Sequence, residues 1–284
     1  MCDAETDRDL ASVSRRNLGL IAGSLGMATA FPARAAALPI TEKMVSVKTP
    51  DGTVDCHFAA PAKGKHPGVI VWPDIYGLRP AVQQLGQKLA ESGYAVLSVN
   101  PFYRSAKAPT SLPDAPRDEA SRAKIGEMRK LMTPEAIERD AKALVAFLDK
   151  QKSVNAKRKI GTTGYCMGGG LIMRTAAAVP SRIGAAASFH GGGLATANPD
   201  SPHLLIPKMK AAFLFAVAEN DDKRNPTEKD KLREACAAAG LLAEIEVYEG
   251  TLHGWCMSDG PAWNPPAAER AWGRMLALFG KALA

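Results

Sequence analysis

The stretch that decides the fold is KIGTTGYCMGGG at residues 159–170, followed by LIMRTA at residues 171–176. It predicts a short buried strand, a very tight turn and a helix. Gly164 and Gly168 flank Cys166 at the spacing Gly-x-nucleophile-x-Gly, in which only residues without a side chain let the two backbones pass so closely. The same pattern also fits a glycine-rich turn that buries a thiol, so catalysis needs further partners for Cys166.

If the turn is a nucleophile elbow, its geometry assigns two groups. The Cys166 sulfur is expected to point out above the carboxyl ends of the strands. The backbone N–H of Met167 is expected at the positive end of the following helix, where it faces an oxyanion that forms on a substrate.

The rest of the chain predicts the sheet around this turn. Buried or alternating apolar runs that read as strands lie at residues 44–47, 53–58, 68–72, 94–99, 183–189, 211–218 and 243–248. Helical patterns begin near residues 80, 133, 225 and 265 and separate most of these runs. Alternation of this kind predicts an α/β fold with a doubly wound, mainly parallel sheet and helices on both faces, in a single domain over residues 37–284. Residues 100–132 carry only a weak helical patch near 119–130 and are predicted to be a lid or binding loop, or else disordered.

The N-terminal segment has the pattern of a targeting signal. Arg15 and Arg16 directly precede an apolar run that ends near Phe31, and Ala33-Arg34-Ala35 follows as a cleavage pattern. Residues 1–36 are therefore predicted to be a signal peptide of the twin-arginine type, used by the bacterial twin-arginine export machinery, which places the mature protein in the periplasm or outside the cell. No later segment has 18 uninterrupted apolar residues, so no stable membrane insertion is expected after cleavage.

Composition bounds the class of protein. The 284 residues carry a formal net charge of +7 and are 46% hydrophobic, as an ordinary globular domain is. The basic residues are scattered and not interleaved with aromatics, which argues against a nucleic-acid partner. The five cysteines include no CxxC and no zinc-ligand spacing, so no metal or cofactor is predicted.

A nucleophilic thiol needs a base, and the base needs an orienting acid. Of the five histidines, His253 lies just after the last strand, at the sheet edge where parallel strands place their ligand loops. It also comes last, as the order nucleophile, acid, base of α/β-hydrolases requires. The acid is expected after the preceding strand, where Asp221 is the first choice and Asp222 the alternative.

Together these motifs resemble the dienelactone hydrolase family. The resemblance rests on the Cys166 elbow, on Asp221, on LHGW around His253, and on WPDIYGL at residues 72–78. It covers about residues 40–284 and implies an α/β-hydrolase fold with a Cys–Asp–His triad. It also implies an oxyanion hole formed by the amides of Met167 and Ile75.

The resemblance assigns further residues, and the sequence departs from it at two places. Where the family has a glutamate that contacts the thiol, this chain has Asp74. Arg104, in the segment NPFYR at residues 100–104, corresponds to an arginine that clamps a substrate carboxylate. The family's second arginine has no counterpart in residues 254–258. Tyr103, His190 and Trp255 are further candidates for substrate contacts.

The resulting prediction is a hydrolase that cleaves an ester or lactone through a thiol ester on Cys166, of the carboxymethylenebutenolidase type. The alternatives are a general carboxylesterase of other specificity on the same fold, and an exported binding protein without activity. The expected partner is a small-molecule ester or lactone, while the oligomeric state stays open.

Overall fold

A computed structural model describes residues 37–110 and 118–284, and the predicted signal peptide lies outside these residues. Its centre is an eight-stranded sheet with the strand order β1-β2-β4-β3-β5-β6-β7-β8. The strands are β1 (Ile40–Thr49), β2 (Gly52–Pro61), β3 (Gly68–Trp72), β4 (Ala95–Val99), β5 (Ile160–Tyr165), β6 (Ile183–Phe189), β7 (Ala212–Ala218) and β8 (Ala243–Tyr248).

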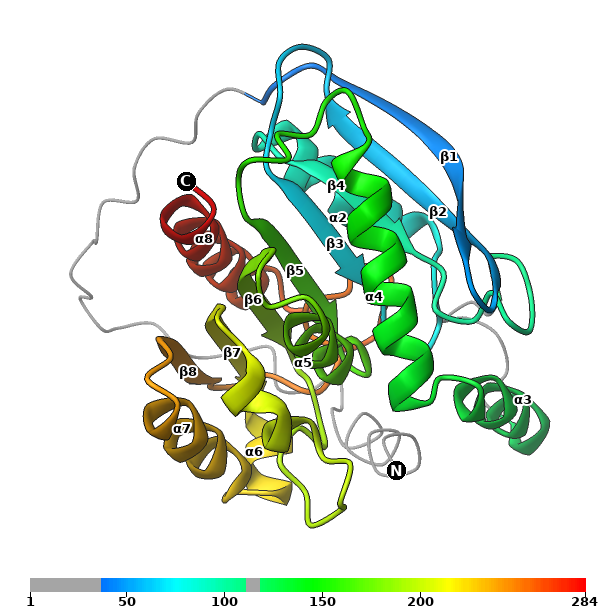
Figure 1. Ribbon diagram of the computed structural model, residues 1–284. Coiled ribbons are helices and arrows are strands. Elements are labelled where there is room, and N and C mark those ends of the chain that lie inside the picture. Colours follow the sequence, from blue (N-terminus) through cyan, green and yellow to red (C-terminus); the bar gives the residue numbers. More distant parts are fainter. Residues whose placement is uncertain (1–36, 111–117) are drawn as a thin grey trace, which may run out of the picture.

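The sheet is mainly parallel. From β4 and β3 through β5 to β8 all neighbouring strands pair in parallel, while the β1–β2 hairpin adds to β4 in antiparallel fashion. Figure 1 shows this hairpin at one edge of the sheet and β8 at the other. The predicted doubly wound α/β fold is confirmed.

Helices cover both faces of the sheet. The described helices are α2 (Pro80–Glu91), α3 (Glu119–Lys130), α4 (Pro134–Asp149), α5 (Gly168–Ala178), α6 (Glu219–Arg224), α7 (Glu228–Ala238) and α8 (Pro265–Ala282), together with the 3-10 helix η1 (Pro202–Lys208). Buried residues of α4, α5 and α7 join one hydrophobic cluster, and those of α2 and α8 join a second cluster on the opposite face. No helix in the described ranges is long and apolar enough to cross a bilayer.

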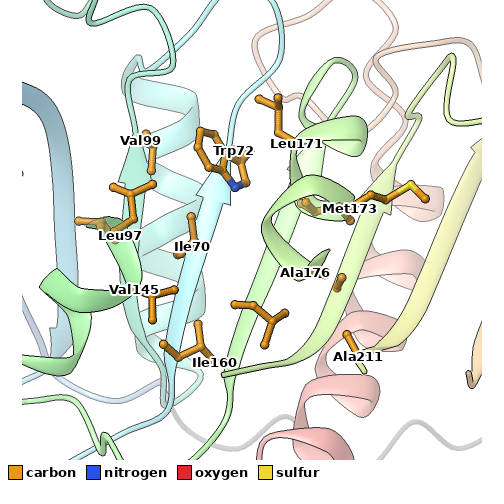
Figure 2. Packing of buried hydrophobic residues seen from close by; sticks show 14 of the residues in the cluster. Ile70, Trp72, Leu97, Val99, Val145, Ile160, Leu171, Met173, Ala176 and Ala211 are labelled. Carbon is orange, nitrogen blue, oxygen red and sulfur yellow. The ribbon is translucent and has the colours of Figure 1, made fainter. Parts of the chain in front are cut away.

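The central strand β3 shows why this sheet forms. All of its side chains are buried, with Ile70 and Trp72 in the cluster under α4 and α5 and Val69 and Val71 in the cluster under α2. Figure 2 shows the first of these clusters, with Trp72 on β3 and Leu171 on α5 among its labelled members. A strand covered on both faces needs a continuous apolar run. Each such side chain contributes about 1.5–3 kcal/mol by leaving water.

The strand order of the sheet reverses at β3, which makes β3 a topological switch point. The strand next in sequence, β4, pairs with one edge of β3, whereas β5 pairs with the other. The loops that follow β3 and β5 therefore diverge at their carboxyl ends, and crevices at such switch points are where open α/β sheets bind ligands. The cysteine turn at the end of β5 lies at this position.

The segment predicted as a lid is partly helical. The weak helical patch forms α3, whose N-cap Asp118 accepts a hydrogen bond from the amide of Ser121 at 2.8 Å. The first residues of the segment 100–132 are bound to β2. Asn100 donates to the Asp55 carboxylate at 2.8 Å, and the amide of Ala108 donates to the same carboxylate at 2.8 Å. Residues 111–117 lie outside the described part of the chain, so the lid stays a prediction.

Candidate active site

Every predicted catalytic side chain follows the carboxyl end of a strand. Strand pairing aligns these ends, since Trp72 lies opposite Gly164, Tyr165 opposite Phe189, and Ala218 opposite Tyr248. The residues that come next are the loop 73–79, Cys166, His190, the stretch 219–221 and the loop 249–264. Residues far apart in the sequence are thereby brought to one edge of the sheet.

The cysteine turn has the strained geometry of a nucleophile elbow. Cys166 has a φ of 53°, in the left-handed region that few residues other than glycine adopt. A Cβ on Gly164 would lie 2.2 Å from the carbonyl oxygen of Gly168, and a Cβ on Gly168 would lie 2.5 Å from the carbonyl oxygen of Trp72. Both glycines are therefore required by close backbone contact.

The same contacts place the two candidate oxyanion donors. Met167 already has helical backbone angles and directly precedes α5, so its amide lies at the positive end of that helix. Gly168 packs against the carbonyl oxygens of Trp72 and Pro73, which begin the loop that carries Ile75. The elbow and the Ile75 loop thus lie in direct contact, as the predicted oxyanion hole requires.

His253 is held by Asp221. Its Nδ1 lies 2.6 Å from Oδ2 of Asp221, and the two side chains are 10% and 11% exposed. An ionised carboxylate can only accept, so Nδ1 carries the proton and Nε2 is left as the basic nitrogen. This is the arrangement in which a carboxylate fixes the tautomer and orientation of a catalytic imidazole.

Hydrogen bonds between backbone amides and side chains join the segments that carry the acid and the histidine. Asn220 accepts a hydrogen bond from the amide of His253 at 2.8 Å. Glu219 accepts one from the amide of Gly250 at 2.5 Å, and the amide of Glu219 donates to the hydroxyl of Thr251 at 3.3 Å. Glu219 and Asn220 begin α6, a short helix that presents Asp221 to the imidazole.

Asp222 points elsewhere. Its carboxylate binds Nζ of Lys229 at 2.5 and 2.7 Å, on α7. The second oxygen of Asp221 accepts from Nη1 of Arg224 at 3.2 Å. Of the two acids left open by the sequence, Asp221 is the one that contacts His253.

This difference gives a prediction for the acid. We expect Asp221→Asn to lower kcat about 100-fold or more, because the amide no longer stabilises the tautomer that leaves Nε2 unprotonated. Asp222→Asn breaks only the contact to Lys229 and is expected to keep kcat within about 3-fold. Ester turnover of both variants measures this, and equal losses would contradict the assignment.

His190 lies behind the nucleophile, fully buried at 0% exposure and with a φ of 41°. Its Nδ1 accepts a hydrogen bond from the amide of Cys166 at 3.1 Å, so this nitrogen carries no proton. Its ring meets the ring of His253 edge to face with centroids 5.1 Å apart. Burial is the main cause that holds the pKa of His190 well below its ordinary value of 6.5, and the nearby His253 lowers this pKa further. His190 is a neutral support for the elbow, not a surface for substrate.

The depressed pKa of His190 predicts a pH dependence of stability. The unfolded chain takes up a proton near pH 6.5 that the folded His190 refuses, so this stabilisation is present above that pH and is lost as the pH falls. Asparagine tolerates positive φ and retains a hydrogen-bond acceptor. We expect the free energy of unfolding of His190→Asn to fall less steeply with falling pH than that of the wild-type protein, by up to about 1.4 kcal/mol per pH unit. Urea unfolding at pH 7.5 and 5.5 tests it, and parallel profiles for both proteins would contradict it.

Asp74, the residue predicted to contact the thiol, forms an ion pair with Arg79. Its two carboxylate oxygens accept hydrogen bonds from Nη1 and Nη2 of Arg79 at 2.7 and 2.9 Å. Arg79 also binds Asp259, in the loop after His253. Neither Arg79 nor Asp259 stands out in the sequence, because they are 180 residues apart and no spacing pattern relates them.

Arg104 and Tyr103, which were predicted to contact the substrate, bind carboxylates of the protein itself. All three nitrogens of the Arg104 guanidinium donate to Asp51 or Asp140, at 2.7–3.2 Å. The Tyr103 hydroxyl donates to Asp140 at 2.7 Å. Asp51 belongs to the β1–β2 turn, and β4 and β3 separate β2 from β5. The two side chains therefore brace the hairpin against α4.

Trp255 is likewise a core residue. It is 0% exposed and stacks on Tyr248 with ring centroids 4.6 Å apart. It anchors the loop that carries His253 to the core and offers no surface to a substrate. Within residues 37–110 and 118–284, no three His, Cys, Asp or Glu side chains gather as they would to hold a metal ion.

The sheet order, the helices on both faces and the loops at the strand ends are those of an α/β-hydrolase. Solved structures share this fold. A dienelactone hydrolase-like promiscuous phosphotriesterase from metagenomic libraries matches with a TM-score of 0.72 and 18% identity, over 87% of this chain and 100% of that one. The dienelactone hydrolase of Anabaena variabilis matches with a TM-score of 0.60 and 17% identity, over 86% and 99%.

The sequence comparison is more specific. Residues 54–283 match the model of the dienelactone hydrolase family, and the chain belongs to that family. The carboxymethylenebutenolidase of Pseudomonas putida is 26% identical over 228 residues, which cover 80% of this chain and 91% of that protein. The protein is therefore a hydrolase enzyme.

Proposed function

We propose that this hydrolase cleaves carboxylic esters or lactones through a thiol ester on Cys166. Nε2 of His253 takes the proton of the Cys166 thiol, and Asp221 stabilises the imidazolium that results. The thiolate attacks the carbonyl carbon, and the carbonyl oxygen becomes an oxyanion. The amides of Met167 and Ile75 donate to this oxyanion, and each such donor contributes about 3–4 kcal/mol to transition-state stabilisation.

Two further steps complete the reaction. The tetrahedral intermediate collapses, the bond to the leaving oxygen breaks, and the His253 imidazolium protonates the departing alkoxide. Water, deprotonated by His253, then attacks the thiol ester and releases the carboxylic acid together with the Cys166 thiol, whose proton returns from the imidazolium. In a lactone the alcohol and the acid stay in one molecule.

One observation carries the proposal. The Asp221–His253 hydrogen bond of 2.6 Å lies at the same sheet edge as the Cys166 elbow. His190 links the Cys166 elbow to the Asp221–His253 pair, since it accepts a hydrogen bond from the amide of Cys166 and packs against the ring of His253. The family membership supports the same reading.

The acyl-enzyme can be trapped. The protein is mixed with 4-nitrophenyl butyrate, quenched with acid within the first turnovers and digested for mass spectrometry. We expect a butyryl group on the peptide that carries Cys166 and on no peptide with Cys56, Cys236 or Cys256. Burial raises the pKa of each of these three thiols and keeps them unreactive. Full turnover after stoichiometric alkylation of Cys166 would contradict the proposal.

The structure favours a second candidate for specificity, a general carboxylesterase that acts on neutral esters. Arg104 is committed to Asp51 and Asp140, and Arg79 is committed to Asp74 and Asp259, so neither offers its charge to a substrate carboxylate. The matched test compares 4-nitrophenyl butyrate with mono-4-nitrophenyl succinate. A higher kcat/KM for the neutral ester favours the carboxylesterase, and a higher value for the acidic ester favours a dienelactone-type substrate.

We also propose that residues 1–36 direct export through the twin-arginine machinery to the periplasm or beyond. The support is the sequence pattern of Arg15-Arg16, the apolar run and Ala33-Arg34-Ala35. Expression in a bacterium with a twin-arginine system, followed by fractionation and N-terminal sequencing, tests it. A paired Arg15→Lys and Arg16→Lys variant is expected to stay in the cytoplasm.

A further inference from the structure

Arg79 forms a buried bridge between two loops. Its side chain is 1% exposed. Nη1 and Nη2 bind the two oxygens of Asp74 at 2.7 and 2.9 Å, while Nε and Nη2 bind the two oxygens of Asp259 at 2.7 and 3.0 Å. A planar guanidinium that meets two carboxylates in this bidentate way fixes the orientation of both.

On one side the bridge controls the turn that carries Ile75. Asp74 directly precedes Ile75, and its Oδ1 also accepts a hydrogen bond from the amide of Tyr76 at 2.9 Å. The carbonyl oxygen of Asp74 accepts from the amide of Gly77 at 3.0 Å, and Nη1 of Arg79 donates to the carbonyl oxygen of Gly77 at 3.2 Å. The Asp74 side chain and Arg79 therefore hold the backbone on both sides of the Ile75 amide in place.

On the other side the bridge controls the loop that carries His253. Consecutive turns run from this histidine to Asp259, closed by Trp255 N–Leu252 O at 3.1 Å, Met257 N–Gly254 O at 2.9 Å and Gly260 N–Met257 O at 3.0 Å. Asn220 binds the amide of His253, and Arg79 binds Asp259. The stretch 253–259 of this loop is therefore held at both of its ends.

The bridge stays charged although it is buried. Burial alone would lower the pKa of Arg79, but Asp74 and Asp259 outweigh it and raise that pKa above its usual range. A buried cation with two carboxylates is costly to break on one side only, because a charge is then left without its partner. The loops are consequently held together as a unit.

We propose that Arg79 is a positioning residue, which holds the oxyanion donor of Ile75 and the base His253 at a fixed distance from each other. This inference rests on the proposed function, because it assigns Arg79 to that same site. Arg79 acts through Asp74 and Asp259, whose carboxylates it binds. Transition-state stabilisation is sensitive to small misplacement of such groups, so the bridge is expected to matter more for kcat than for KM.

The variant that tests it is Asp259→Asn, which cuts the link between the loops and leaves the Asp74–Arg79 pair in place. Its matched control is Asp149→Asn, because Asp149 forms a similar bidentate pair with Arg182 and the two aspartates are equally exposed, at 31%. That pair joins α4 to the residues just before β6. A side chain of this exposure is expected to be replaceable without loss of the fold.

We expect Asp259→Asn to lower kcat about 10–100-fold with KM within about 2-fold. Asp149→Asn should leave kcat within about 2-fold. Asp259→Glu, which restores a carboxylate, should recover part of the lost kcat. Amide hydrogen exchange should become faster in residues 73–79 and 250–264 of Asp259→Asn and stay unchanged there in Asp149→Asn.

An active Asp259→Asn protein with unchanged kcat and unchanged exchange in both loops would overturn the inference. Equal losses of kcat in both variants would also overturn it, since the bridge would then be an ordinary structural ion pair. Failure of the proposed function is distinguishable, because the wild-type protein would then show neither ester turnover nor a Cys166 adduct. In that case exchange in the two loops alone decides whether Arg79 couples them.

Discussion

Cys166→Ala is expected to abolish ester turnover, with kcat/KM at least about 1,000-fold below that of the wild-type protein. The sulfur is the atom that forms the covalent intermediate, so no neighbouring group replaces it. The residual rate comes from substrate binding and from the oxyanion donors, which act on a water attack as well. Initial rates on 4-nitrophenyl butyrate at pH 7.5, with the concentration of folded protein verified by circular dichroism, measure the loss.

Cys236→Ala is the matched control for this substitution. Cys236 is also a buried thiol, but it lies on α7 within the core cluster under α5, and burial raises the pKa of its thiol. Its replacement removes one buried sulfur and is expected to cost about 1 kcal/mol of stability, with turnover unchanged. Cys166→Ser is a second control, because a hydroxyl keeps the shape and loses the nucleophilicity of a thiolate. Retained turnover in Cys166→Ala would remove the acyl-enzyme from the mechanism.

The buried strands could be predicted from the sequence almost to the residue. The observed β3 and β6 have the ranges that were expected, because strands inside a parallel sheet need continuous apolar runs bounded by turn residues. The edge strand β8 also has its expected range, which an alternating pattern of apolar and polar residues marks. The edge strand β1 was predicted too short, over residues 44–47. Its outer residues are mostly exposed and polar, so hydrogen bonding to β2 extends the strand where no hydrophobic pattern marks it.

The position of the candidate site followed from the same logic. A residue that comes directly after a parallel strand lies at the carboxyl edge of the sheet, whatever its distance along the chain. Cys166, Asp221 and His253 could be placed together on that ground. The choice of Asp221 over Asp222 needed more, since α6 turns one carboxylate to the imidazole and the other to Lys229.

The partners of the charged side chains could not be predicted. The substrate role of Arg104 was predicted from the resemblance of NPFYR at residues 100–104 to a family segment, and Arg79 was not singled out. Three of their four carboxylate partners come from distant parts of the chain. Asp259 is 180 residues from Arg79, while Asp51 and Asp140 are 53 and 36 residues from Arg104. A long, flexible arginine reaches any of several carboxylates, and only the folded arrangement decides which of them is close and buried enough to bind.

Gly164→Ala is expected to prevent folding or to cost about 4 kcal/mol or more of the free energy of unfolding, a large share of the stability of a typical domain. The new Cβ would lie 2.2 Å from the carbonyl oxygen and 2.4 Å from the carbonyl carbon of Gly168. These are backbone atoms of the first turn of α5, so relief requires α5 to move away from β5. The measurements are soluble yield and, where the variant folds, urea unfolding followed by circular dichroism.

Two other glycines make this prediction a graded series. A Cβ on Gly161 would lie 2.9 Å from Cδ1 of Leu283, a flexible side chain that can turn away, so Gly161→Ala is expected to cost about 1–3 kcal/mol. A Cβ on Gly280 would meet nothing within 4 Å, and alanine favours the helix α8, so Gly280→Ala is expected to stabilise by about 0.5–1 kcal/mol. The order Gly280, Gly161, Gly164 follows from what each Cβ meets: open space, a side chain, or backbone. If Gly164→Ala proved as stable as Gly280→Ala, the tight elbow that presents Cys166 would not exist in the protein.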